Sequence, residues 1–368
     1  MGKKILSTII AVALLISQTL FVFAESPSEW EKMYLNTGEF LQQTEETAVG
    51  SVNGEWKVIG LARAGLGLAR SDENAYLKAV ETYVEENMDE DSKLDPNRST
   101  EHSRLILALT ALGKDPNNVS GYNLLYALGD FDFVIRQGLN GPIWALIALD
   151  CGNYDVPERT DVVTPVTRQV LIEYILDKVC ADGGWNLYGD KPDVDMTAMA
   201  IQALAAYYDE NNDVKYAVDK ALAVLAEMQD SSGAFYSYGS INLESTAQVV
   251  VALTSLGINP ETDQRFIKEG NSLLDGMAMF YIEGGGFSHL QDGQRDGMAT
   301  EQGYYAMTAY ERFLEGKTPL YDMSDVKESH DYNYGMIFVV AALCICLVAA
   351  VILLKHKARV KHQGERDC

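Results

Sequence analysis

The chain has 368 residues, a formal net charge of −24 and only five cysteines. A protein this acidic repels nucleic acid and anionic lipid headgroups, which excludes nucleic-acid binding through net charge. Two cysteines outside the C-terminal region, Cys151 and Cys180, are able to pair in an oxidising compartment. They do not make a disulfide framework, so the fold must depend on a hydrophobic core.

The first 24 residues have the features of a secretory signal peptide. Lys3 and Lys4 supply the positive start, and an apolar stretch follows over residues 5–23. Small or branched residues precede a cleavage position after Ala24, as a signal peptidase requires. We therefore expect residues 1–24 to be removed on export.

A second apolar run, residues 335–354, predicts one transmembrane helix. It contains no charge and is long enough to cross a hydrocarbon core of ~30 Å. The basic tail at 355–368 follows directly, and positive residues stay on the cytoplasmic side. This predicts a single-pass cell-membrane protein, typical of bacteria, with an extracellular domain over residues 25–320, a linker over 321–334 and a cytoplasmic C-terminus.

An internal repeat is the most informative feature of the middle of the chain. Six segments share an acidic or turn residue followed by a small and apolar helix with Ala-Leu or Ala-Met near its middle. They begin near residues 55, 101, 142, 195, 244 and 301. Since these helices are apolar nearly all round, we expect them to be buried on all sides.

More amphipathic stretches alternate with these six segments. They cover residues 30–46, 74–88, 117–129, 164–180, 213–228 and 263–281. Alternation of buried and half-exposed helices predicts an all-α fold, an α/α toroid in which six inner helices lie inside six outer ones over residues 25–320.

Three links between units carry a glycine-aromatic signature: Gly183-Gly184-Trp185, Gly233-Ala234-Phe235 and Gly285-Gly286-Phe287. Glycine lets the chain turn sharply, and the aromatic ring fills the gap between adjacent units. Together with Gln229, four residues before Gly233, the repeat resembles that of the squalene/oxidosqualene cyclase and protein prenyltransferase superfamily. This resemblance implies an α6/α6 toroid over residues 50–314, in a superfamily that also includes cobalamin carriers and complement-type thioester domains.

The resemblance implies one candidate catalytic group. Class II cyclases protonate a polyene with the middle Asp of an Asp-x-Asp-Asp motif, and Asp193-Val194-Asp195-Met196 matches three of its four positions. Asp195 would be the acid, and Asp193 the neighbouring carboxylate that keeps it protonated. The structural alternative is that either residue caps the helix that starts there.

Other activities of the superfamily lack their residues. Zinc-dependent prenylation needs Asp and Cys two positions apart, and the extracellular part has no Asp-x-Cys, so we expect no zinc. A thioester needs Cys before Gly-Glu-Gln, whereas Gly54-Glu55-Trp56 follows Asn53. The cobalamin carriers are the remaining branch, although this chain lacks their second, β-rich domain.

The leading hypothesis is therefore a surface toroid that binds a ligand, such as a corrinoid or isoprenoid, or a partner protein at the mouth where its inner helices start. Acidic residues predicted at this mouth are Glu55, Glu101, Asp195, Glu244 and Glu301. Aromatic residues on or just before the inner helices are Trp56, Trp144, Trp185, Tyr207, Phe235, Tyr304 and Tyr305. The alternatives are a cyclase-like enzyme, a glycan-active enzyme with two opposed carboxylates, and a spacer or adhesin without a pocket.

Overall fold

The computed structural model describes residues 27–44, 47–237 and 239–327, which are mostly helical with two short two-stranded sheets. The predicted signal peptide (1–24), transmembrane helix (335–354) and basic tail lie outside the described residues. Within the described ranges, no helix is both long and apolar enough for a membrane span.

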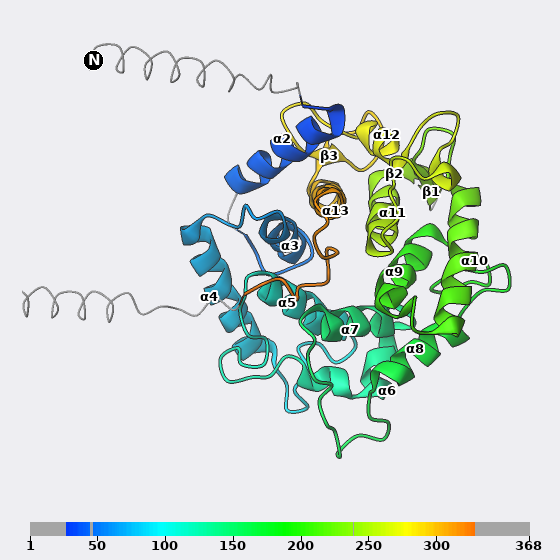
Figure 1. The fold of residues 1–368 in the computed structure, drawn as a ribbon. Helices are drawn as coiled ribbons and strands as arrows, with labels where there is room; N and C mark the ends of the chain where they lie inside the picture. Colours follow the sequence, from blue (N-terminus) through cyan, green and yellow to red (C-terminus); the bar gives the residue numbers. More distant parts are fainter. Residues whose placement is uncertain (1–26, 45–46, 238, 328–368) are drawn as a thin grey trace, which may run out of the picture. The chain divides into compact units, whose positions relative to one another are not determined.

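Six helices coincide with the six repeat segments, and we call them the inner helices. They are α3 (Glu55–Arg63), α5 (Thr100–Ala111), α7 (Asn140–Cys151), α9 (Val194–Leu204), α11 (Leu243–Ser255) and α13 (Gly297–Leu314). Each packs against the next in chain order, and α13 packs against α3 (Figure 1). Their residues are buried nearly all round, as the apolar sequences predict.

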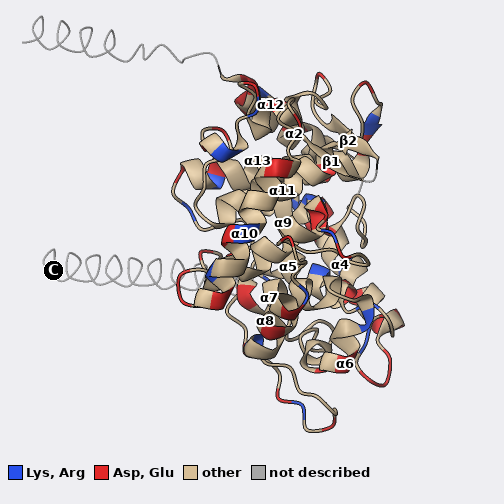
Figure 2. Ribbon diagram, turned by 90° about the vertical axis from the view of Figure 1, so that its right-hand side faces the viewer, with Lys and Arg blue, Asp and Glu red and all other residues tan. Residues whose placement is uncertain are grey.

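The helices that alternate with them, which we call the outer helices, vary more in length, from 4 residues in α6 to 18 in α4. They are α2 (Glu29–Gln43), α4 (Arg70–Asn87), α6 (Phe131–Val134), α8 (Arg168–Asp177), α10 (Asn212–Met228) and α12 (Leu273–Ala278). α10 buries one face, including Val214, Val218 and Leu222, against the inner helices, as its amphipathic sequence predicts. Asp and Glu residues occur on many of the helices and loops, with Lys and Arg residues among them (Figure 2).

Two predicted outer helices are wrong in extent. Residues 117–129 form a turn and the 3-10 segment η1 (Tyr126–Gly129), because Ser120 and Gly121 both adopt positive φ. Within 263–281 only η4 (Gln264–Phe266) and α12 are helical, because Glu269 and Gly270 interrupt the pattern with positive φ. Residues with positive φ cannot continue a right-handed helix.

Three units share the same polar contacts at the start of the inner helix. Before α9, Asp193 accepts the N–H of Met196 (2.8 Å), and the Thr197 hydroxyl accepts the N–H of Trp185 (3.0 Å). Before α11, Asn242 accepts the N–H of Ser245 and Thr246 accepts the N–H of Phe235. Before α13, Asp296 accepts the N–H of Ala299 and Thr300 accepts the N–H of Phe287. A cap and a threonine thus fix each glycine-aromatic link to its own helix.

The links turn as the glycines predict. Gly233 has φ +88°, and a Cβ there would lie 2.0 Å from the carbonyl oxygen of Ser272, so only glycine fits. The Gln229 amide donates to the carbonyls of Gly233 (2.9 Å) and Phe266 (3.0 Å). Two hairpins, β1 (Phe235–Ser237) with β2 (Ser240–Asn242) and β3 (Phe287–Ser288) with β4 (Arg295–Asp296), connect these links to α11 and α13.

The segment after α13, residues 318–325, packs onto the helices, and we call it the strap. Arg63 donates to the carbonyls of Leu320 (2.9 Å) and Asp322 (2.7 Å) and to the carboxylate of Asp325 (2.6 Å). Arg312 reaches the other oxygen of the same carboxylate (2.7 Å). The compact unit therefore extends to Lys327, whereas the sequence predicted a linker from residue 321.

Candidate functional site

The inner helices begin at one common end, which we call the N-terminal end. Several of the predicted acids at this end contact residues of a neighbouring repeat. Arg104 of α5 binds Glu55 of α3 at 2.6 Å and Glu101 of its own helix at 2.7 Å. Glu55 is wholly buried and also accepts the hydroxyl of Tyr76 (3.2 Å). Through Arg104, these two carboxylates therefore join adjacent units.

The acids of the later units are also engaged. Asp195 accepts a hydrogen bond from the hydroxyl of Ser237 (3.1 Å). Burial raises the pKa of Asp195, although hydrogen bonds from Ser245 and Ser237 lower it. Glu244 lies 2.8 Å from the ring Nδ1 of His289, and burial raises the pKa of this carboxyl as well.

Glu301 is the most perturbed acid of this end. Its Oε1 accepts the N–H of Asn53 at 2.5 Å, whereas its Oε2 is buried and has no hydrogen-bond partner. Burial raises the pKa of Glu301 to about 7, although the Asn53 N–H and the charge of Lys57 oppose the shift. A carboxyl in this position costs free energy when it ionises.

Asp193 caps a helix, which is the structural alternative predicted from the sequence. It is the N-cap of α9, and the position equivalent to it in the next unit is Asn242, which caps α11 in the same way. An asparagine cannot supply a proton as a carboxylic acid does, so the repeat requires only a cap here. Burial raises the pKa of both Asp193 and Asp195, and the charge of Asp195 adds to the shift of Asp193, so the cyclase-like pairing stays a prediction.

The predicted aromatics divide into a central group and a packing group. In the central group, the rings of Trp56 and Trp144 lie 5.1 Å apart, Tyr305 lies 6.0 Å from Trp56, and the strap's Tyr321 lies 5.7 Å from Trp144. These rings come from α3, α7, α13 and the strap and occupy the space between the inner helices. A cavity of about 230 Å³, lined by Trp56, Trp144 and Glu101 among others, remains at the N-terminal end.

Three other predicted aromatics, Trp185, Phe235 and Tyr304, pack against neighbouring segments of the fold. Trp185 is fully buried, and its indole donates to the carbonyl of Ile175 (2.7 Å), while Phe235 is equally buried. Tyr304 stacks on Tyr34 of the outer helix α2, with ring centroids 5.4 Å apart. Trp185 and Tyr304 therefore contribute to packing, and their predicted contact with a ligand at the mouth stays a prediction.

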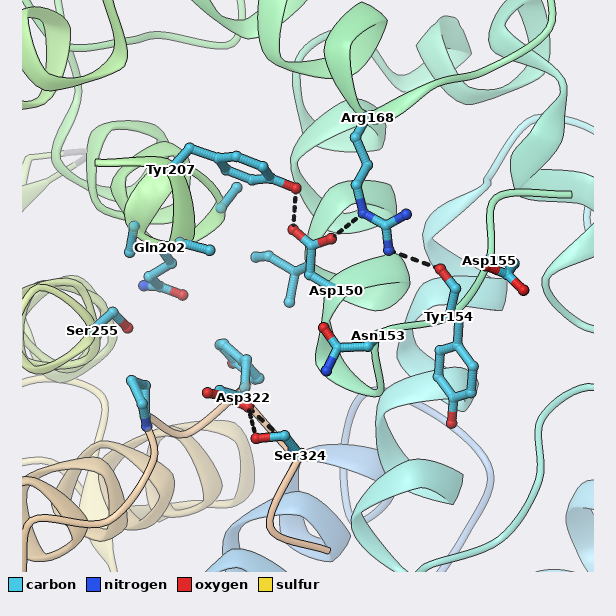
Figure 3. A pocket seen from close by; sticks show the side chains of 16 residues that line it. Asp150, Asn153, Tyr154, Asp155, Arg168, Gln202, Tyr207, Ser255, Asp322 and Ser324 are labelled. Carbon is cyan, nitrogen blue, oxygen red and sulfur yellow. Dashed lines mark hydrogen bonds and ion pairs between the residues drawn. The ribbon is translucent and has the colours of Figure 1, made fainter. Parts of the chain in front are cut away.

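The larger cavity lies at the opposite, C-terminal end of the inner helices and has a volume of about 580 Å³. We call it the C-terminal pocket. Residues from α7, α9, α11, the loop after α7 and the strap surround it (Figure 3). Its polar lining consists of Asp150, Asn153, Tyr154, Asp155, Arg168, Gln202, Tyr207, Ser255, Tyr321, Asp322 and Ser324.

One side of the C-terminal pocket is a rigid polar network. Arg168 Nε binds Asp150 Oδ1 at 2.6 Å, and the Tyr207 hydroxyl donates to Asp150 Oδ2 at 2.7 Å. The same guanidinium donates to the carbonyls of Leu149 (2.9 Å) and Tyr154 (2.8 Å). Burial and the Asp150 carboxylate raise the pKa of Tyr207, so its hydroxyl stays protonated. Figure 3 shows these side chains on the wall of the pocket.

The other side of the C-terminal pocket has polar atoms without partners. Gln202 and Tyr321 are each only 7% exposed. The Nε2 of Gln202 binds the side chain and carbonyl of Gln248, but its Oε1 has no hydrogen-bond partner, and neither does the Tyr321 hydroxyl. Leaving such a group unsatisfied costs about 1–3 kcal/mol. A ligand that supplied partners would recover part of this free energy.

Sequence reasoning singled out Tyr207 alone among the residues of this pocket. Asp150, Arg168 and Gln202 lie at helix ends or in apolar runs without a recognisable motif, and the strap lay in the predicted linker. Cys151 and Cys180 are both buried and unpaired. In the described part of the chain, no group of three or more His, Cys, Asp or Glu is placed to hold a metal.

No protein-family model and no curated protein matches the sequence. The functional argument therefore depends on the residues and their geometry.

Proposed function

We propose that this chain is a binding protein of the α/α-toroid type, which holds a small polar ligand in the C-terminal pocket. The closed series of contacts from α3 through α13 and back to α3 supports the toroid, in which six inner helices lie inside six outer ones. The predicted signal peptide and terminal membrane span support an extracellular domain anchored to a cell membrane.

The observation that carries the proposal is that two residues lining the cavity of about 580 Å³, Gln202 and Tyr321, each have a buried polar atom without a hydrogen-bond partner. Buried polar groups in native proteins are normally hydrogen-bonded, so two exceptions at one cavity indicate a site that a ligand completes. The volume suits a small molecule and lies within the range of ligand pockets.

Binding is favoured over catalysis because both oxygens of the half-buried Asp150 carboxylate already bind side chains of the protein. Arg168 occupies one oxygen of Asp150 and Tyr207 the other. A general acid or base needs a free position toward the substrate. Asp195, the acid that the cyclase resemblance implies, bonds to serine hydroxyls at the N-terminal end and does not line this pocket.

The proposal is tested by a thermal-shift screen of the purified full-length chain against corrinoids, isoprenoids, glycans and small organic ions. A ligand of the folded state raises the unfolding midpoint in proportion to its occupancy. We expect a stabilising compound whose effect is lost in the double variant Gln202→Met, Tyr321→Phe. The matched control is Tyr304→Phe, which removes another buried, unpartnered hydroxyl away from the pocket.

A screen without any stabilising compound would contradict the proposal. So would a compound that stabilises the double variant and the wild type equally, since its site would then lie elsewhere.

A further inference from the structure

We infer that the ligand of the C-terminal pocket is an organic cation, an amidinium, guanidinium or ammonium group on a small body; this rests on the proposed function. The pocket's ionisable lining carries three carboxylates, Asp150, Asp155 and Asp322, against the single guanidinium of Arg168. The unpartnered atom of Gln202 is an acceptor, so the lining requires a donor from its ligand.

The backbone contributes in the same direction. The helices α7, α9 and α11 all end at this pocket, at Cys151, Leu204 and Ser255. A helix C-terminus carries roughly −0.5 of an elementary charge, so three ends directed at one cavity favour a positive group.

Arg168 already shows how this end of the molecule binds a cation. Its guanidinium is held by one carboxylate, that of Asp150, and by the carbonyls of Leu149 and Tyr154 around the end of α7. This arrangement neutralises Asp150. Asp155 and Asp322 have no further basic residue beside them in the lining of the pocket, although the Arg63 guanidinium that holds the strap interacts with the charge of Asp322. Asp155 is exposed on the rim, and Asp322 accepts only the N–H and hydroxyl of Ser324.

Aromatic rings add a surface for the body of such a ligand. Tyr154, Tyr207 and Tyr321 all line the cavity. Aromatic faces attract a cation or stack on a flat one, and their contribution is greatest when water is excluded. An anionic ligand would instead be repelled by the carboxylates and by the partial negative charge of the helix ends.

The test compares matched probes that differ in charge alone. Benzamidinium, benzamide and benzoate form one series of similar shape, and choline and 3,3-dimethyl-1-butanol form a second. We expect isothermal titration of the full-length chain to show at least tenfold tighter binding of the cation than of its neutral partner in one series or both. Benzoate should not bind, and the cation's affinity should fall with added salt.

Charge-neutralising variants locate the effect. The double variant Asp155→Asn, Asp322→Asn should weaken binding of the cation at least fivefold, since both carboxylates line the pocket. Asp190→Asn removes an exposed carboxylate outside the pocket and should change the affinity less than twofold.

Neutral probes that bind as tightly as the cations, or cations that bind equally to the double variant, would overturn the inference. A corrinoid, isoprenoid or glycan that depends on Gln202 and Tyr321 in the screen above would then leave the proposed function standing. If no probe in either series binds, the cation inference is also overturned, and that screen alone decides the function.

Discussion

The two ends of the inner helices use polar residues in opposite ways. At the N-terminal end, Glu55 and Glu101 are paired with Arg104, and Asp195 is held by serine hydroxyls. At the C-terminal end, Gln202 and Tyr321 keep atoms without partners beside a cavity of about 580 Å³. The comparison teaches that the acids of five of the six repeats bind residues of the N-terminal end, although Glu301 keeps one oxygen without a partner, while the candidate binding site is built where the helices end.

The central rings separate the two ends. Trp56 and Trp144 lie toward the N-terminal cavity, and Tyr321 of the strap contacts Trp144 from the side of the C-terminal pocket. The strap supplies both a separating ring and a wall of the pocket. We therefore expect loss of its attachment to lower the free energy of unfolding more than loss of any single acid at the N-terminal end.

The largest effect is expected at that attachment. Replacing Arg63 with Met removes the donors to the strap carbonyls and leaves buried acceptors unsatisfied, so we expect a loss of about 3 kcal/mol or more in the free energy of unfolding. Urea unfolding measures it. The control Arg265→Met breaks a more exposed ion pair with Asp263 and should cost less than about 1 kcal/mol. Equal losses in the two variants would mean that the strap adds nothing to stability.

The next effect is a pH dependence at the N-terminal end. The pKa of Glu301 is about 7 in the folded chain against an ordinary value of 4.5, so the folded state favours the protonated acid. Its stabilisation is fully present below pH 4.5 and is lost as the pH rises through 7, a decrease of about 3 kcal/mol.

Glu301→Gln should remove that decrease, which unfolding curves at pH 4 and pH 8 would reveal as a difference from the wild type. Glu283→Gln, an exposed position, is the matched control and should reproduce the wild-type profile. A Glu301→Gln profile parallel to that of the wild type would show that this carboxyl is not perturbed.

A smaller effect is expected from the unpartnered hydroxyl of the strap. Tyr321→Phe deletes a buried group that lacks a partner, so without ligand the variant should be as stable as the wild type or up to about 1 kcal/mol more stable. Thermal unfolding of the ligand-free chain measures this. A clear destabilisation would indicate that the hydroxyl has a partner and that the pocket is complete without ligand.

The smallest effect is expected at the cap of α9. Asp193→Asn should change the free energy of unfolding by less than about 0.5 kcal/mol, because asparagine caps helices equally well and does so before α11. Asp193→Ala should cost about 1 kcal/mol. A large loss in the asparagine variant would show that the charge itself matters and would revive a role for this carboxylate beyond capping.

The sequence was sufficient for the inner helices because burial on all sides leaves an unmistakable apolar pattern, repeated six times. It was weaker for outer elements such as 117–129, where positive φ at Ser120 and Gly121 ends a pattern that apolar spacing alone would continue. Glu55, Glu101, Asp195 and Glu244 lie in the first turns of their helices, as predicted, whereas Glu301 lies in the second turn because α13 begins at Gly297. Their pairing with Arg104 or with serines was not predictable, because those partners belong to other repeats and carry no motif.

The candidate site was nearly invisible in the sequence for a related reason. Gln202 lies within an apolar helix, and Arg168 and Asp150 are separated by a loop whose path the repeat does not specify. Tyr321 belongs to a segment that composition assigns to a linker. The hydrogen bonds of Arg63 and Arg312 and the burial of Leu320 and Met323 explain why it folds back. Sites assembled from helix ends and a returning strap depend on tertiary contacts more than on local pattern.

The most direct test asks which end of the inner helices binds ligand. Ala206→Trp fills the rim of the C-terminal pocket, and Ser51→Trp fills the N-terminal cavity, each from an exposed position. Calorimetric titration of the full-length variants with benzamidinium should show at least a tenfold loss of affinity for Ala206→Trp and less than a twofold change for Ser51→Trp. The reverse order, or a binding constant unchanged in both variants, would contradict the placement of the site at the C-terminal end.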